Sequence, residues 1–340
     1  MPIHWVASVV EFNVGLDWVC NRAIFRPSDF AVWTTHSRRA PSDWISSLKV
    51  AYLKRLEYQL KQLVYHNRDG SFTTQANRKK HLKRFARELR MLGYNQMHVR
   101  SLKLKHVHAL IKHWQGAGSS IGTQKNALAH LRWWARKIGK DEMIPKSNNE
   151  LLIGKRKLIP AVSKAQYLTR TELKLVSNEY MRLSIELQQQ FGLRQEESLK
   201  FRPSYADKGS HIELKGSWTK GGRKRSIPVV TFDQRDLIDR IHAIVGQGSL
   251  IPVQYSLKQW KKKYERVLGI LRFKNLHGLR HGYAQRRYRD LAGFESVFAG
   301  GPKRRALDSN QQVIDVQARL QVSQELGHNR IEITDVYLGR

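Results

Sequence analysis

The sequence has few cysteines, few acidic residues and no long apolar runs. Its 340 residues include one cysteine, Cys20, which excludes an intramolecular disulfide and any zinc site built on cysteines. Asp and Glu number 28 against 61 Lys and Arg, so the net charge is +33. No segment reaches the roughly 18–20 continuous apolar residues that span a bilayer. The early apolar patch "WVASVV" has no basic region before it and no clean cleavage site, so it is not typical of a signal peptide.

What remains is a basic chain that can still bury a core, since 41% of its residues are hydrophobic. A charge this large repels itself unless a polyanion neutralises it, which favours nucleic acid as partner, with a membrane surface as the competing polyanion. The length favours two domains. A cytoplasmic, nucleoid-associated protein fits these observations.

The hydrophobic pattern divides the chain into four parts. Residues 1–47 have no clear period and are either an arm that folds on a partner or a leader. Residues 48–141 show helical spacing of apolar residues and predict a compact all-α domain. Residues 142–160 have the turn residues and weak period of a linker, and residues 161–340 form the second domain.

A basic outer face distinguishes the first domain. Its helical patterns begin at Leu48 and Thr74, pass through Val107 to Trp114, and end with Leu128 to Ile138. The stretch "NRKKHLKR" is either a solvated face or a phosphate-binding face. Acidic partners are few, which favours phosphate contact. The predicted DNA contacts there are Arg78, Lys79, Lys80, Lys83 and Arg84, and Arg223 and Lys224 add to them in the second domain.

The second domain is predicted to be mainly helical with one small β-hairpin. "TRTE", residues 169–172, has the form of a capping box that starts a helix, and a helical pattern then runs through "MRLSIELQQQFGLRQEESLKF". "HIELKG" and "RSIPVV" indicate two strands, and Gly221 and Gly222 mark the hairpin tip between them. Further helices are expected after Phe232 and through "SLKQWKKKYERVLGI", "HGLRHGYAQRRYRD" and "VIDVQARLQVSQELG".

Each candidate for chemistry in this domain is modest when taken alone. Arg194 is expected on a helix with Glu197 three residues later on the same face, which is also the pattern of a surface ion pair. Lys220 at the hairpin tip could reach into a groove, or it could be a solvated lysine. His277 and Arg280 share a helix face and could clamp a phosphate, whereas the neighbouring His281 is expected to point elsewhere.

The last stretch, "LGHNRIEITDVYLGR", predicts a short helix that starts at His328 and carries Tyr337. Tyrosine is a poor nucleophile at its usual pKa of roughly 10. Cationic and imidazole groups around its hydroxyl would assist an attack on phosphorus.

The order and wording of these segments carry a resemblance. "GLRQEE", "TKGGRKRSIPV", "HGLRHG" and "LGHNRIEITDVYLG" are similar to the motifs of the tyrosine recombinases, the phage-integrase family, over roughly residues 161–340. The helical domain resembles the SAM-like core-binding domain of that family. The long stretch between "LRHG" and "LGH" resembles the integrases of integrative elements and genomic islands. Only "LGR" follows the tyrosine, where many relatives continue with a segment that docks on a neighbouring subunit.

The resemblance implies an enzyme that cuts and rejoins DNA for the integration or excision of a mobile element. Tyr337 is the implied nucleophile, Arg194 and Arg280 hold the phosphate, and Glu197 supports them. Lys220 is the implied general acid, His277 the proton acceptor and His328 a phosphate ligand. The implied partners are double-stranded DNA attachment sites, further copies in a homotetramer, and accessory DNA-bending or directionality factors.

No cofactor or metal is expected, because the phosphotyrosine keeps the bond energy. The sequence has no Gly-x-x-x-x-Gly-Lys-Ser/Thr loop and no carboxylate cluster for paired magnesium ions. Three alternatives stay open: a type IB topoisomerase, a non-catalytic DNA-binding protein, and an RNA-binding protein that uses Trp133 and Trp134 as stacking platforms.

Overall fold

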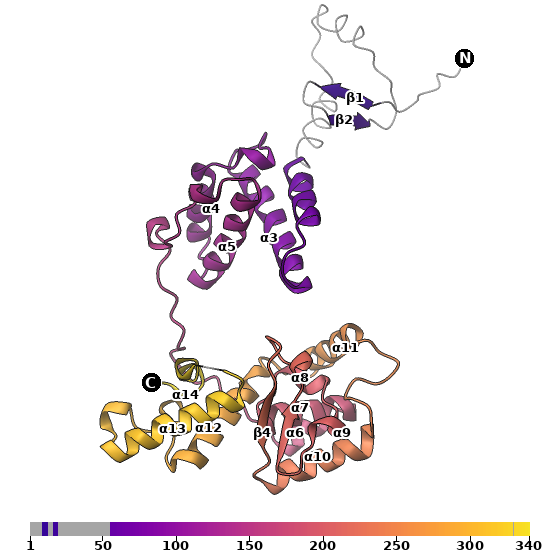
Figure 1. Cartoon of the computed structure of the whole chain (residues 1–340), viewed down its shortest axis with the longest axis vertical. Helices are drawn as coiled ribbons and strands as arrows, with labels where there is room; N and C mark the ends of the chain where they lie inside the picture. Colours follow the sequence, from indigo (N-terminus) through magenta and orange to yellow (C-terminus); the bar gives the residue numbers. More distant parts are fainter. Residues whose placement is uncertain (1–8, 13–15, 20–54, 329) are drawn as a thin grey trace, which may run out of the picture. The chain divides into compact units, whose positions relative to one another are not determined.

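The computed structural model describes residues 9–12, 16–19, 55–328 and 330–340. The chain divides into two compact units, Met1–Arg156 and Lys157–Arg340 (Figure 1). The division falls inside the segment 142–160 that the sequence predicts as a linker. The earlier part of that segment belongs to the first unit, because Ile144, Leu151 and Ile153 are buried in its core.

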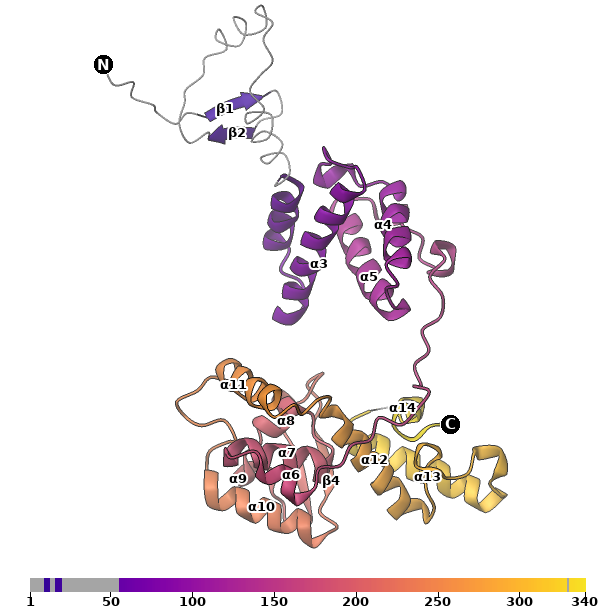
Figure 2. The same ribbon diagram turned by 180° about the vertical axis from the view of Figure 1, so that it is seen from behind.

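The first unit is helical over its described residues 55–156, and Figure 2 shows its later helices side by side. A helix covers 55–66 and is followed by α3 (Phe72–Met91), α4 (Leu104–Gly116) and α5 (Ile121–Lys137). Ser71 and Ser120 cap α3 and α5, since each hydroxyl accepts a hydrogen bond from the backbone N–H three residues later. The core combines aliphatic side chains with Phe85, Trp114 and Trp134. Burying each such side chain contributes about 1.5–3 kcal/mol.

Two short strands precede this bundle. β1 (Val9–Phe12) and β2 (Leu16–Val19) pair antiparallel. The sequence pattern had shown no period there, so the hairpin is a feature that the prediction missed. The remainder of residues 1–47 and the predicted helix start at Leu48 lie outside the described residues.

The second unit is mainly α with one small sheet, which confirms the predicted fold class. Its helices are α6 (Arg170–Lys174), α7 (Glu179–Phe191), α8 (Gln195–Leu199), α9 (Pro203–Ala206), α10 (Phe232–Val245), α11 (Leu257–Ile270), α12 (His277–Ala292), α13 (Ser309–Glu325) and α14 (Asp335–Leu338). Its strands are β3 (His211–Leu214) and β4 (Arg225–Pro228), and they form the predicted hairpin, with Leu214 opposite Arg225. The capping box of Thr169 and Glu172 is also present.

Helix α7 is the central element of this unit, because it packs against α8, α10 and α12. It ends at Phe191, and Gly192 follows in the left-handed conformation with φ of 62°. A Cβ at Gly192 would lie 2.5 Å from Cδ1 of Tyr283, so the close approach of α12 also requires a glycine here. The prediction of a single helix through Arg194 is therefore wrong. The first helix ends before Gly192, and Arg194 is the N-cap of the next helix, α8.

A second correction concerns the end of α13. His328 was predicted to start a helix, but it lies in the turn that ends one. Gly327 has φ of 69°, the His328 N–H donates to Ser323 O at 2.8 Å, and the Gly327 N–H donates to Gln324 O at 2.8 Å. These two bonds form a Schellman motif, which satisfies the last carbonyls of a helix. The one-turn helix α14 then carries Tyr337.

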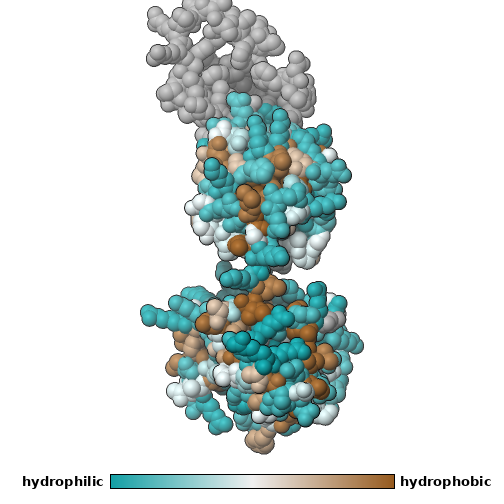
Figure 3. Space-filling model, turned by 90° about the vertical axis from the view of Figure 1, so that its left-hand side faces the viewer, coloured by the Kyte–Doolittle hydropathy of each residue, from teal (hydrophilic) through white to brown (hydrophobic). Residues whose placement is uncertain are grey.

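Polar side chains cover much of the faces visible in Figure 3, with apolar patches between them. Within the described ranges, no helix is long and apolar enough to cross a membrane. No group of three or more His, Cys, Asp or Glu side chains that could hold a metal ion occurs in the same part of the chain.

Candidate active site

Arg280 is at the centre of the site, on the first turns of α12. It is 1% exposed, and its guanidinium donates to the carbonyl oxygens of Gly192 and Leu326. Those carbonyls follow the ends of α7 and α13, where the partial negative charge of a helix favours a cation. Burial lowers the pKa of Arg280 to about 10, so the side chain stays positively charged at neutral pH.

Tyr337 lies against this guanidinium. Its hydroxyl is 3.4 Å from Arg280 Nε and 3.3 Å from His328 Nε2, and the side chain is 5% exposed. Gln285 holds the backbone nearby by donating to the Tyr337 carbonyl at 2.9 Å. The candidate nucleophile thus lies within hydrogen-bond distance of the same side chains that are expected to bind the phosphate.

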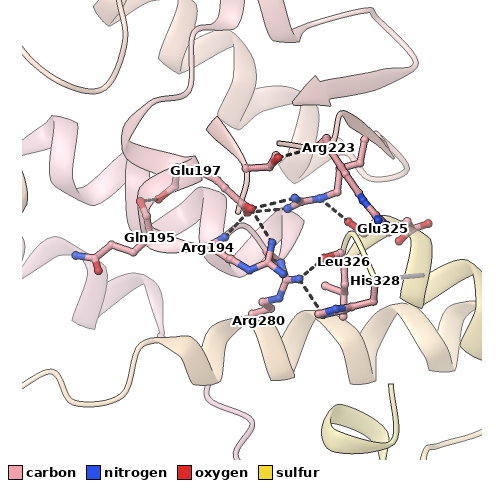
Figure 4. A network of polar contacts seen from close by, with 12 residues as sticks. Arg194, Gln195, Glu197, Arg223, Arg280, Glu325, Leu326 and His328 are labelled. Atoms are coloured by element: carbon pink, nitrogen blue, oxygen red, sulfur yellow. Dashed lines mark hydrogen bonds and ion pairs between the residues drawn. The ribbon is translucent and has the colours of Figure 1, made fainter. Parts of the chain in front are cut away.

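Arg194 and Glu197 form the opposite wall. Arg194 Nη1 donates to Glu197 Oε1 at 2.8 Å, and the Arg194 backbone N–H donates to Oε2 at 2.7 Å. Figure 4 shows Arg194, Arg280 and His328 turned toward one another beside this carboxylate. The predicted contact between Arg194 and Glu197 exists, but it arises from helix capping instead of a shared helix face.

The Glu197 carboxylate is 1% exposed and accepts hydrogen bonds from a second arginine. Arg225 at the start of β4 donates to both of its oxygens, from Nη1 at 3.0 Å and Nη2 at 2.7 Å. Burial alone would raise the pKa of Glu197, but the hydrogen bonds and charge of Arg225, with Arg194 and Arg280, lower it to about 2. Glu197 is therefore a permanent anion that offsets part of the positive charge in the site.

The three histidines near Tyr337 all have a lowered pKa. Burial is the largest cause, and nearby charged groups add to it. The pKa of His277 is lowered, and the pKa values of His281 and His328 are lowered to about 4. All three imidazoles are neutral at pH 7 as a result. A neutral imidazole can accept a proton or a hydrogen bond through its free nitrogen.

His281 was predicted to point away from the others, and this is wrong. Its ring centroid is 4.5 Å from that of Tyr337, whereas the His277 ring centroid is 6.4 Å away. His281 is 4% exposed, and its Nδ1 is buried without a hydrogen-bond partner among the described residues. A residue four positions after His277 returns to nearly the same helix face, because 3.6 residues complete a turn.

Lys220 is not gathered with this group. It is exposed at the tip of the β3–β4 hairpin, beside Gly221 and Gly222 with φ of 93° and 73°. Arg223 and Lys224 are exposed in the same loop, and Lys224 Nζ lies 3.9 Å from Glu213 Oε1. The hairpin tip therefore presents three cations to solvent.

The predicted DNA contacts of the first unit fall into two groups. Lys79, Lys80 and Lys83 are exposed on α3, and Arg84 is half-buried beside Glu88. The prediction that Arg78 lies on the exposed basic face is corrected, because only 6% of this residue is exposed. Its guanidinium donates to Asp69 and stacks 4.2 Å from the Trp133 ring. Trp133 is 6% exposed and Trp134 is fully buried, which leaves neither ring as a stacking platform on the surface.

Arg225 and His281 are the site residues that the sequence pattern did not identify. Arg225 stands in the basic run "RKR", where it resembles a further surface cation. The alternation of β4 gives a signal for it, since Arg225 and Ile227 are buried while Ser226 is exposed. For His281 the signal is its spacing of four from His277.

Two family profiles match the chain. The profile described as "Phage integrase, N-terminal" matches residues 53–144, and the one described as "Integrase" matches residues 154–286. Together they cover more than half of the chain. The second profile includes Arg194, Lys220 and Arg280 and ends before His328 and Tyr337. A search of curated proteins gave no match.

Solved structures with a similar fold include DNA complexes. A lambda integrase dimer bound to a COC′ core site has a TM-score of 0.54 at 16% identity, covering 92% of this chain and 85% of that one. XerH recombinase bound to a palindromic difH substrate, in a post-cleavage complex, has a TM-score of 0.51 at 16% identity, covering 92% and 89%. A lambda integrase tetramer bound to a Holliday junction has a TM-score of 0.51 at 15% identity, covering 97% and 92%. At these identities the likeness concerns the fold.

Proposed function

The chain belongs to the phage integrase family, the tyrosine recombinases, and from that premise we propose that it is a site-specific recombinase that breaks and rejoins DNA through Tyr337. The single observation that carries the assignment to Tyr337 is the position of its hydroxyl, 3.4 Å from Arg280 Nε and 3.3 Å from His328 Nε2. Integration or excision of a mobile element is the process that this activity serves. The finer branch, the integrases of genomic islands, stays a prediction from the sequence.

The proposed reaction transfers one phosphoryl group. The Tyr337 oxygen attacks the scissile phosphorus, a bond forms between them, and the bond from phosphorus to the 5′ oxygen breaks. The products are a 3′-phosphotyrosine and a free 5′-hydroxyl. The tyrosine proton passes to a base and the 5′ oxygen receives a proton from an acid, so the step needs no water and no nucleotide. A second 5′-hydroxyl reverses the step on a new strand.

Arg194 and Arg280 bind the non-bridging oxygens in this proposal. An arginine has five N–H groups, and four of those on Arg280 face Gly192, Leu326, His328 and Tyr337. The remaining N–H group can face a phosphate. A positioned donor that stabilises developing charge commonly contributes a factor of about 10²–10³ to the rate.

The histidines divide the remaining tasks. His277 accepts the tyrosine proton, and its lowered pKa favours the neutral form that this task needs. His328 binds the phosphate by donating a ring N–H, which the neutral imidazole retains. Without DNA, His328 Nε2 lies 3.3 Å from the Tyr337 hydroxyl, and the tautomer of the ring decides which of the two donates. Lys220 protonates the departing 5′ oxygen, which requires the exposed hairpin tip to approach the bound DNA.

The proposed substrate is double-stranded DNA at specific attachment sites, and the proposed working form is a homotetramer on two synapsed duplexes. The net charge of +33 supports the first statement. The fold shared with a lambda integrase tetramer bound to a Holliday junction supports the second. Action at the nucleoid with DNA-bending or directionality factors completes the proposal.

A covalent adduct tests the function directly. Nicked suicide duplexes drawn from the flanks of the protein's own gene are incubated with the wild type, with Tyr337→Phe and with Tyr255→Phe, which removes a remote hydroxyl near Lys263. We expect an adduct stable in detergent with the wild type and Tyr255→Phe, and none with Tyr337→Phe. An adduct in Tyr337→Phe refutes the assignment of the nucleophile. Relaxation of supercoils without strand exchange between two sites would instead assign the chain to topoisomerase activity.

A further inference from the structure

Arg225 is a buried cation to which the reaction described above gives no task. It is 9% exposed at the first position of β4, and all three of its side-chain nitrogens are bonded. Nη1 and Nη2 donate to the two oxygens of Glu197, and Nε donates to the Glu325 carbonyl at 2.9 Å. Such a fork-to-fork pair fixes direction as well as distance.

These bonds connect three segments that carry the proposed catalytic groups. Arg225 is five residues after Lys220 on the same hairpin. Glu197, to which Arg225 donates, also accepts hydrogen bonds from the side chain and the backbone N–H of Arg194. Glu325 ends α13 and is followed at once by the turn that carries His328.

The contact with that turn is also steric. Gly327 packs so closely on Arg225 that a Cβ there would lie 3.0 Å from Arg225 Cδ. The aliphatic part of the arginine therefore supports the turn, while the guanidinium holds the carboxylate on the other side. No other single side chain described in this unit bonds to both Glu197 and Glu325.

We propose that Arg225 is a positioning residue for DNA cleavage, which sets the alignment of Arg194 through Glu197 and joins the Lys220 hairpin to the turn of His328. The inference rests on the proposed recombinase function and deepens it. Arg225 itself is buried and has no task in binding DNA, so its loss slows the chemical step and leaves DNA affinity unchanged.

The electrostatics of Glu197 provide a signature that a merely structural arginine would lack. Charged or titratable groups facing this carboxylate are Arg194, Arg225, Arg280, His277 and His328. Arg225 makes the largest contribution that lowers the pKa of Glu197. Without it we expect the pKa to rise, so that the carboxyl takes up a proton at a higher pH than in the wild type and Arg194 then loses its charged partner.

The test compares Arg225→Met with Arg235→Met. Arg235 is a matched control, because it makes the same two-pronged bond to Asp207, at 3.0 and 2.7 Å, in the same unit and away from Tyr337. Single-turnover cleavage of the suicide duplex is measured from pH 5 to pH 8, with DNA affinity measured separately. We expect Arg225→Met to cleave about 10²-fold more slowly, the scale of a misplaced catalytic group. We also expect its rate to fall further toward pH 5, while Arg235→Met follows the wild type.

A second variant covers the case in which Arg225→Met does not fold. Arg225→Lys keeps the charge and loses the fork, so we expect a rate about 10-fold below the wild type, with the wild-type pH profile. A wild-type rate in Arg225→Lys or Arg225→Met at every pH overturns the inference, as does a loss of DNA affinity that accounts for the whole defect.

Hydrogen exchange separates this inference from the proposed function. Arg225→Met should exchange faster than Arg235→Met in the hairpin 215–224 and in the turn 326–328, whether or not the protein cleaves DNA. Absence of any wild-type adduct at Tyr337 would overturn the recombinase proposal alone. Unchanged exchange in both segments would overturn the positioning inference alone.

Discussion

Replacing Glu197 with glutamine removes one buried charge and keeps the shape of the side chain. The carboxylate is 1% exposed and receives hydrogen bonds from Arg194 and Arg225. The amide of the new side chain would offer one oxygen where the carboxylate offers two. Arg225 would then keep its position beside a neutral group, which is costly for a buried cation.

The size of the effect follows from the pKa of Glu197. The native fold lowers it from 4.5 to about 2, a difference that corresponds to about 3 kcal/mol of stability at neutral pH. Breaking a buried pair by removing one partner typically costs about 3–5 kcal/mol, which agrees. Because the native pKa is depressed, this contribution is complete above pH 4.5 and is lost as the pH falls through 2. At pH 3 more than half of it should be gone.

The assay is hydrogen exchange of peptides from α7 and α12 across a urea series, which reports the opening free energy of this unit alone. Glu186→Gln is the control, since Glu186 lies on α7, which packs against the α8 helix of Glu197, and pairs with an arginine, Arg240, at 2.6 Å. We expect Glu197→Gln to lose about 3 kcal/mol at pH 7 and less than half of that at pH 3. A loss that is the same at both pH values, or no larger than in Glu186→Gln, would refute the electrostatic reasoning.

Further predictions concern the helix ends and the histidines. Arg280→Lys should lower the cleavage rate about 10²–10³-fold, because one ammonium cannot reach both carbonyls, Tyr337 and a phosphate; single-turnover kinetics within tenfold of the wild type would contradict this. Gly192→Ala should destabilise by about 2–4 kcal/mol through backbone strain and a clash, whereas Gly246→Ala, with φ of 51° and open space, should show strain alone in thermal unfolding. Stability should fall as the pH falls from 6.5 toward 4, because unfolding lets His281 and His328 take up protons that they do not bind in the native fold. His281→Phe should reduce that slope in melting curves, and an unaltered slope would contradict the assignment.

The helices and the hairpin could be predicted because their signals are local. Thr169 and Glu172 form a capping box within four residues, and Gly221 and Gly222 lie where the chain must reverse. Apolar spacing of three and four residues likewise needs no knowledge of the neighbours. The fold class follows from such signals, whereas the family is indicated by the resemblance of the motifs.

The breaks in the helices were harder to predict because their causes lie far along the chain. Gly192 could be tolerated inside an apolar helix, and the side chain that requires it there, Tyr283, is on α12. The turn at Gly327, which ends α13, is likewise packed against Arg225 of the distant strand β4. In both cases tertiary packing decides where the helix stops.

The charges of the site show a similar division. The charge pattern of "RKR" does not by itself show that its last arginine turns inward, since the partner carboxylate is 28 residues away, and only the alternation of β4 indicates it. His281 was misjudged for a different reason, because the helical period alone places it beside His277. The basic stretch around Arg78 predicts an exposed side chain, although Asp69 and Trp133 enclose it.

The hydroxyl of Tyr337 lies against two side chains that bind the phosphodiester in the proposed reaction. Arg280 Nε and His328 Nε2 are both engaged with it before any DNA is present. In the proposed reaction, phosphate and nucleophile therefore compete for the same two side chains, and we expect the bound phosphate to displace the Tyr337 hydroxyl before the attack. We therefore expect the protein without bound DNA to leave free phosphate esters uncut.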